Sequence, residues 1–188
     1  MLFRSASFIS ERKKQVISVG RLHYDKNFES LLRIWALLAT KHPDWRLKII
    51  GEGELEVSLQ AMAVDLGIKD SVIFTGALPH EKVMEELSMS SCYAMTSHYE
   101  SFGIALAEAM SCGTPPVAFN VRVGPEYIIS DGIDGFLIPQ KDETAFAEKL
   151  ELLLENDEKF RFMSDNSFKK AEQFSKTAVI SKWLEILL

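Results

Sequence analysis

Two positively charged side chains follow the first apolar run of the sequence. Residues 15–20 are rich in β-branched side chains and end in Gly20; Arg21 comes directly afterwards, and Lys26 follows five residues later. A glycine allows a sharp turn at a strand end. Arginine supplies a planar fork of donors and lysine a compact charge, and this combination suits a diphosphate. Two solvated side chains on a loop are the alternative, and these residues alone leave it open.

A pair of glutamates frames the second candidate group. Glu100 and Glu108 are separated by seven residues that include Gly103. Free backbone N–H groups at the start of a helix attract phosphate, and a glycine there permits close approach. On a continuous helix the two glutamate Cα atoms would lie about 12 Å apart, so that each carboxylate reaches a different sugar. Glu100 as a simple helix cap is the alternative. The segment 104–110 is apolar except for Glu108 and is predicted to form a buried helix, in which a charge needs a partner.

The elements that must position these groups alternate in type. Short apolar or β-branched runs lie at residues 15–20, 47–51, 72–76, 92–97, 116–119 and 135–139. Helical apolar periodicity fills the intervals, and only helical patterns follow the last run. This rhythm predicts an α/β fold, a Rossmann-like doubly wound parallel sheet of about six strands with a helical C-terminal extension. Ligands of such sheets bind beyond the carboxyl ends of the strands, where both candidate groups fall.

Composition restricts the classes of partner and location. The 188 residues include 21 Lys and Arg against 27 Asp and Glu, and the net charge of −6 argues against broad binding to nucleic acid or anionic lipid. A hydrophobic content of 47% is ample for a packed core. No apolar run approaches the roughly 18 residues of a membrane span. Residues 1–5 lack the apolar core of a secretory signal, and Cys92 and Cys112 form no CxxC pair, so a cytoplasmic location is expected.

The remaining polar features are interpreted as structural. His42 and His80 adjoin prolines and are expected in turns, while His23 and His98 are expected at the surface or in turns, although they stand near the candidate groups. The stretch 51–53 has two glycines but no third one that would complete a dinucleotide-binding fingerprint.

Four motifs occur in order along this chain: Arg21 with Lys26, Thr96-Ser97, Glu100-x7-Glu108, and Asp131-Gly132-x-x-Gly135-Phe136-Leu137. Together they resemble the retaining GT-B glycosyltransferases of family 4. The resemblance runs from about residue 15 to the end and corresponds to the C-terminal, donor-binding half of such enzymes, one half of a GT-B fold. It implies a tail or interdomain linker at residues 1–14, a nucleotide-sugar-binding domain at residues 15–188, and an N-terminal acceptor domain outside this chain.

The resemblance also implies roles for individual residues. Arg21 and Lys26 would neutralise the pyrophosphate of the donor and of the leaving group. Glu100 would contact hydroxyls of the transferred sugar, and Glu108 would bind the ribose hydroxyls. Other donor-binding positions that the resemblance implies are Gly20, Gly76, Ser101, Phe102, Gly103 and Ile104. Among these, the backbone of residues 102–104 would touch the distal phosphate, and the turn at Gly76 would grip the base.

The implied activity is transfer of a hexosyl group from a nucleotide sugar, with a UDP-sugar favoured, to a glycan or lipid-linked acceptor. No cofactor or metal is expected, because the resembled enzymes work without one and the chain has no Asp-x-Asp motif. The fragment alone is expected to be inactive, and any membrane association would come through the absent domain. Alternatives are a non-catalytic nucleotide-sugar-binding module and a GT-B-type epimerase or phosphorylase. The terminal apolar stripe with Trp183, Leu184, Leu187 and Leu188 is expected to be partly exposed or self-associated.

Overall fold

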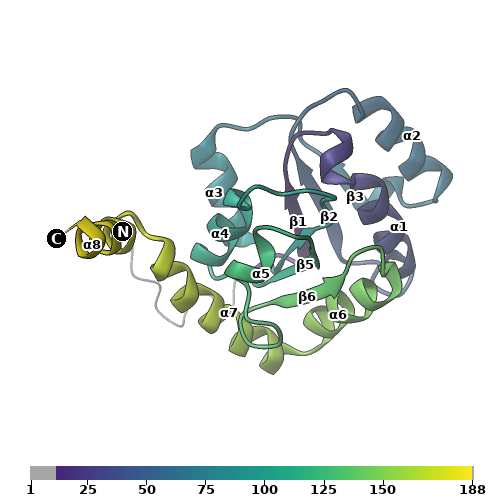
Figure 1. Ribbon diagram of the computed structural model, residues 1–188. Helices are drawn as coiled ribbons and strands as arrows, with labels where there is room; N and C mark the ends of the chain where they lie inside the picture. Colours follow the sequence, from purple (N-terminus) through teal and green to yellow (C-terminus); the bar gives the residue numbers. More distant parts are fainter. Residues whose placement is uncertain (1–11, 188) are drawn as a thin grey trace.

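A single parallel sheet organises the chain, as shown by a computed structural model that describes residues 12–187 (Figure 1). The strand order is β3-β2-β1-β4-β5-β6. The strands are β1 (Gln15–Val19), β2 (Arg46–Ile50), β3 (Val72–Phe74), β4 (Cys92–Met95), β5 (Pro116–Asn120) and β6 (Phe136–Pro139). Every predicted strand is confirmed, with ends that agree within two residues. The predicted Rossmann-like α/β fold is therefore confirmed.

Helices cover both faces of the sheet. The helices are α1 (Phe28–Ala39), α2 (Glu56–Asp65), α3 (His80–Met89), α4 (Ile104–Ser111), α5 (Pro125–Ile128), α6 (Glu143–Glu155), α7 (Asp157–Ala171) and α8 (Lys176–Leu187), with short 3-10 turns η2 (Tyr24–Lys26), η3 (Lys69–Ser71) and η4 (Glu172–Phe174). Side chains such as Val16 and Leu47 pack toward α1, α2 and α6, whereas Ile17 and Ile50 pack toward α3, α4 and α5. Burial on both faces explains why the strands read as continuous apolar runs.

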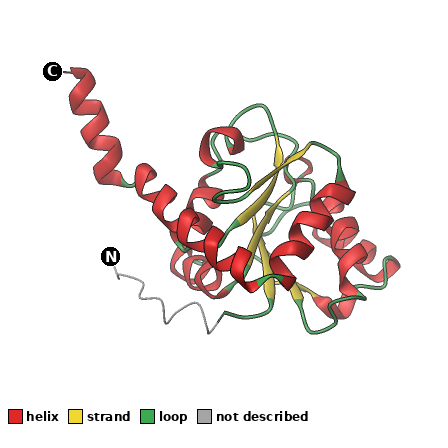
Figure 2. Cartoon of the chain, turned by 90° about the horizontal axis from the view of Figure 1, so that it is seen from below, coloured by secondary structure: helices red, strands yellow, loops and turns green. Residues whose placement is uncertain are grey.

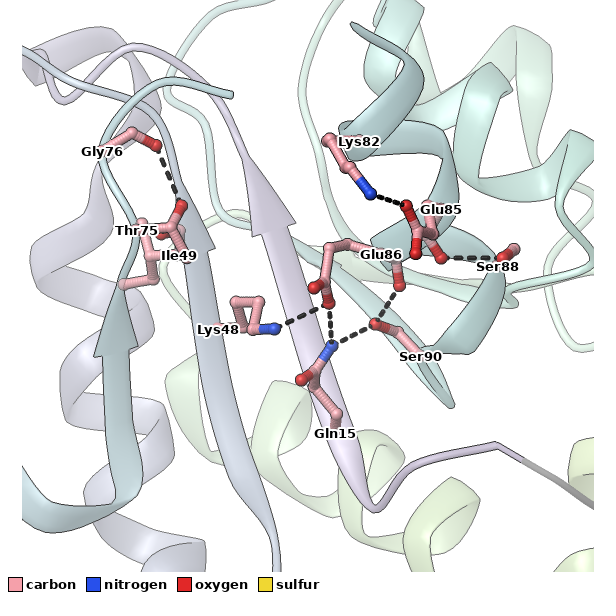
Figure 3. A network of polar contacts seen from close by, with 10 residues as sticks. All are labelled: Gln15, Lys48, Ile49, Thr75, Gly76, Lys82, Glu85, Glu86, Ser88 and Ser90. Carbon is pink, nitrogen blue, oxygen red and sulfur yellow. Dashed lines mark hydrogen bonds and ion pairs between the residues drawn. The ribbon is translucent and has the colours of Figure 1, made fainter. Parts of the chain in front are cut away.

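A buried charged residue lies within this apolar sheet. Lys48 on β2 is buried and places its Nζ 2.6 Å from Glu86 Oε2 on α3 (Figure 3). Gln15 on β1 donates to the same carboxylate oxygen at 3.4 Å and to Ser90 Oγ at 2.7 Å. Burial alone would raise the pKa of Glu86, but the hydrogen bonds from Lys48 and Gln15 outweigh it and lower that pKa. This network fixes α3 against β1 and β2.

The C-terminal helix projects from the body of the domain (Figure 2). Its exposed apolar side chains are Val179, Ile180, Trp183, Leu184 and Ile186. The predicted partial exposure of this segment is confirmed, while self-association stays a prediction. Leu188 and the side chain of Leu187 lie outside the described residues. Within the part of the chain that the structure covers, no helix has both the length and the apolar character needed to cross a membrane.

The predicted tail at residues 1–14 falls mostly outside the described residues. Of its described part, Arg12 donates hydrogen bonds to the Ser90 carbonyl at 2.6 Å, to Thr114 Oγ1 at 3.0 Å and to the Cys112 carbonyl at 2.8 Å. Arg12 therefore ties the chain to the ends of α3 and α4 before β1 begins.

Candidate functional site

The candidate groups converge where the strand order reverses. β1 lies between β2 and β4, so the loops that follow β1 and β4 run to opposite sides and leave a crevice beyond the strand ends. A hollow of about 370 Å³ occupies this crevice. Its lining residues are Val19, Gly20, Lys26, Tyr93, Met95, Glu100, Ser101, Phe102, Gly103, Ile104, Ala105, Leu106 and Glu108. Eight of the ten predicted site residues line it, because segments 80 residues apart meet here.

The loop after β1 is tied to the loop after β4. Asn27, in the left-handed region with φ 50°, donates from Nδ2 to the Thr96 carbonyl at 3.0 Å. Thr96 Oγ1 in turn donates to the Asn27 carbonyl at 2.9 Å. Both side chains are buried, so this reciprocal pair fixes the end of η2, which carries Lys26. A Cβ on Gly20 would lie 3.3 Å from Lys26 Cγ and Cδ, so the glycine leaves room for the lysine stem.

Lys26 and Glu100 form an ion pair at the edge of the hollow. Lys26 Nζ lies 2.6 Å from Glu100 Oε1, and the side chains retain 29% and 11% of their exposure. Ser97 Oγ also donates to Glu100 Oε1 at 2.8 Å. The carboxylate is thereby held with one oxygen engaged, while the ammonium group keeps donors for an anion entering from solvent.

The start of α4 supplies backbone donors. Gly103 is the N-cap, with φ 93°, and no side chain caps the helix. The first turn holds no acidic residue, and Ile104 and Ala105, which line the hollow, carry first-turn N–H groups that a helix leaves without an internal partner. The interpretation of Glu100 as a helix cap is therefore wrong. Glu100 precedes the helix by a turn, so the two glutamates do not lie on one continuous helix as the 12 Å estimate assumed.

A glycine after β5 supports the same segment. Gly124 has φ 100°, and a Cβ there would lie 2.5 Å from the Phe102 carbonyl oxygen and 3.4 Å from Glu100 Cβ. The loop that leads into α5 therefore packs its backbone directly against residues 100–102. A larger residue at position 124 would displace the loop that carries Glu100.

Glu108 lies at the other side of the hollow, facing a residue on α3. Its side chain is 27% exposed, and its Oε1 lies 3.7 Å from His80 Nδ1. The prediction of a buried helix is wrong for one face of α4, because Ile104 is 69% exposed, while the face with Leu106, Ala109 and Met110 is buried. The sequence assigned His80 only to a turn, although the structure places it as the first residue of α3, beside Glu108.

Tyr93 on β4 lines the hollow together with Glu100 and Glu108. Its hydroxyl donates toward the Val19 carbonyl at 3.5 Å, and its ring is buried on β4. Burial of this hydroxyl, and then the negative charges of Glu100 and Glu108, raise the pKa of Tyr93. The Tyr93 hydroxyl is therefore close enough to both carboxylates for their charges to affect its pKa. Sequence reasoning missed Tyr93 and Met95, and their alternate positions on a strand that precedes the glutamates are the signal that points to them.

Two predicted site residues lie outside the lining of the hollow. Arg21 is exposed on the loop that follows β1. Gly76 has φ 69° and forms an isolated bridge with Gly51, whose N–H donates to the Gly76 carbonyl at 3.0 Å. The structure therefore does not bring Gly76 into the hollow, because β3 is separated from β1 by β2. Roles for both residues stay predictions.

A group of side chains with metal-binding geometry lies elsewhere. Among the described residues, the ligand atoms of His42, Glu151 and Glu155 lie within 4.8 Å of one another. Lys41 Nζ already lies 3.0 Å from Glu151 Oε1, and His42 Nε2 lies 3.3 Å from the same oxygen. These contacts account for the cluster as an ion-pair network that joins the end of α1 to α6.

Comparison with known proteins identifies the family. The family model described as "Glycosyl transferases group 1" matches residues 2–170. The chain belongs to this family. A curated relative of this group 1 chain, an uncharacterized glycosyltransferase from Haemophilus influenzae, is 38% identical over 175 residues, which cover 93% of this chain and 49% of the relative. The chain thus spans about half the length of that relative.

Solved structures share the fold of this group 1 domain. A variant of S. aureus TarM, solved with fondaparinux, α-GlcNAc-glycerol and UDP, matches 92% of this chain and 35% of its own with a TM-score of 0.85 and 26% identity. The pneumococcal O-GlcNAc transferase GtfA, solved with UDP and GlcNAc, matches 94% of this chain and 36% of its own with a TM-score of 0.84 and 25% identity. Both are longer proteins of which this chain resembles one part.

Proposed function

We propose that this chain is the donor-binding half of a retaining glycosyltransferase that uses a UDP-sugar. The observation that carries the proposal is the shared hollow in which Lys26, the uncapped start of α4 and the two glutamates face one another. Lys26 and the start of α4 supply positive charge, and the two glutamates supply hydrogen-bond acceptors on either side of it. This arrangement fits a diphosphate that joins a sugar to a nucleoside. The matched TarM and GtfA structures were solved with UDP, which supports the choice of nucleotide.

The diphosphate binds between Lys26 and the N-terminus of α4. The Lys26 ammonium group donates to the diphosphate as a compact positive charge. The N–H groups of Ile104 and Ala105 add further donors, together with the positive end of the helix dipole. Arg21 is exposed on the loop after β1, and in this proposal its side chain turns toward the outer oxygens of the ligand. Lys26 is paired with Glu100, so the diphosphate competes with this carboxylate for the lysine rather than meeting an isolated charge.

The two glutamates select the groups at the ends of the diphosphate. Glu100, held by Lys26 and Ser97, accepts hydrogen bonds from hydroxyls of the transferred sugar. Glu108 accepts from the ribose hydroxyls on the α3 side of the hollow. A carboxylate accepts from two neighbouring hydroxyls at once, which suits a sugar diol.

Bond cleavage at the anomeric carbon leaves an additional negative charge on the departing nucleoside diphosphate. Lys26, Arg21 and the α4 N–H groups face the oxygens where this charge develops, so they stabilise the transition state more than the ground state. The chain spans 49% of the length of a curated relative, and we infer that the acceptor is bound by the additional region that such longer relatives have. Transfer by this chain alone is therefore not expected.

Thermal unfolding with a panel of nucleotides tests the proposal. A ligand at ten times its Kd stabilises the folded state by about 1.4 kcal/mol, which raises the Tm by about 3–6 °C in a domain of this size. UDP and UDP-sugars should do this, GDP and ADP much less. Glu108→Ala should reduce the shift, and the exposed Glu148→Ala on α6 serves as the control. An unchanged Tm with every nucleotide at millimolar concentration would refute the proposal.

A further inference from the structure

His80 lies beside Glu108, and the proposed donor contacts do not use it. It begins α3 directly after Pro79, whose backbone is extended with ψ 145°. The imidazole is 69% exposed, and its Nδ1 lies 3.7 Å from Glu108 Oε1. α3 and α4 pack side by side, and the Lys48–Glu86 network fixes α3 on the sheet, so the imidazole is presented to Glu108 by an anchored helix.

The distance of 3.7 Å between His80 Nδ1 and Glu108 Oε1 is within ion-pair range and longer than a normal hydrogen bond. The Glu108 side chain is 27% exposed, so packing holds it only in part and a polar partner restricts the orientation of its carboxylate. A donor on one oxygen leaves the other oxygen directed to a ligand.

We propose that His80 is a positioning residue that holds the Glu108 carboxylate for the ribose hydroxyls of the nucleotide. This inference rests on the proposed function, because it assigns a partner to the glutamate that the proposed function places at the ribose. His80 acts through Glu108, and its contribution therefore depends on the ribose hydroxyls and not on the diphosphate.

Calorimetric titration of UDP, 2′-deoxy-UDP and inorganic pyrophosphate separates these contributions. His80→Ala should weaken UDP binding about two- to fivefold, the range of a partly exposed pair, and should leave pyrophosphate binding unchanged. The preference for UDP over 2′-deoxy-UDP should shrink in the same variant. His80→Gln retains an N–H donor of similar reach and should restore the preference. The control is His42→Ala, because His42 also pairs with a glutamate but lies just before β2, at the other end of the sheet.

The outcomes distinguish this inference from the proposed function. If UDP binds and Glu108→Ala weakens it, but His80→Ala keeps the full preference for UDP over 2′-deoxy-UDP, the positioning role is refuted while the donor site stands. Equal weakening of UDP and pyrophosphate by His80→Ala also refutes it, since that pattern reports a general disturbance of the site. If the wild-type chain binds neither UDP nor pyrophosphate, the proposed function itself fails.

Discussion

Replacement of Lys26 by alanine tests the electrostatic centre of the site. The change removes an ammonium group 2.6 Å from Glu100 Oε1 and leaves that carboxylate, 11% exposed, with Ser97 as its remaining described donor. A hydrogen bond to a charged group contributes about 1.5–3 kcal/mol. At about 1.4 kcal/mol for each factor of ten, Lys26→Ala should raise the Kd for UDP about 10- to 150-fold. Because the pair is partly exposed, the fold itself should lose only about 1 kcal/mol.

Isothermal titration calorimetry measures the Kd, and thermal unfolding shows that each variant is folded. Lys26→Arg keeps the charge and should bind UDP within about threefold of the wild type. Lys41→Ala removes an exposed lysine that also pairs with a glutamate, Glu151, at 3.0 Å, and it should have no effect on binding. A folded Lys26→Ala protein with wild-type affinity for UDP would refute the assignment of Lys26 to the diphosphate.

Three further predictions concern the frame of the site. Gly51→Ala places a Cβ 1.9 Å from the Gly20 carbonyl at φ 145°, so it should cost at least about 2 kcal/mol in denaturant unfolding; an unchanged midpoint would contradict this. Lys48→Met should cost about 2 kcal/mol at neutral pH. Because the folded state lowers the pKa of Glu86, its stabilisation is complete above about pH 4.3 and is lost as pH falls through the folded pKa; Lys48→Met should flatten that acid dependence in unfolding titrations. Burial raises the pKa of the Cys92 thiol, so iodoacetamide should label it only after unfolding, as mass spectrometry would show.

Much of the fold follows from local sequence patterns. Strands buried on both faces read as short apolar runs, and turns mark their ends, so the positions of all six strands could be predicted. The approach of Lys26 to Glu100 could also be predicted in outline, because the strand order of a doubly wound sheet brings the loops after β1 and β4 together.

The rest depends on tertiary packing that spacing does not encode. The exposure of Ile104 depends on which face of α4 meets the sheet, and an almost uniformly apolar helix carries no period that reveals this face. The contact between His80 and Glu108 depends on how α3 packs against α4. The neighbouring proline alone therefore predicted only a turn at His80. Gly76 lies outside the hollow because β2 separates its strand from β1.

In the proposed site, the loop after β1 and the start of α4 bind the same ligand. Amide NMR spectra of the isotope-labelled chain, recorded during a titration with UDP, test this most directly. Signals of residues 20–26 and 100–108 should shift along a single binding curve, while signals of α6 should stay in place. Shifts confined to one of these two segments, or centred on another surface of the domain, would contradict it.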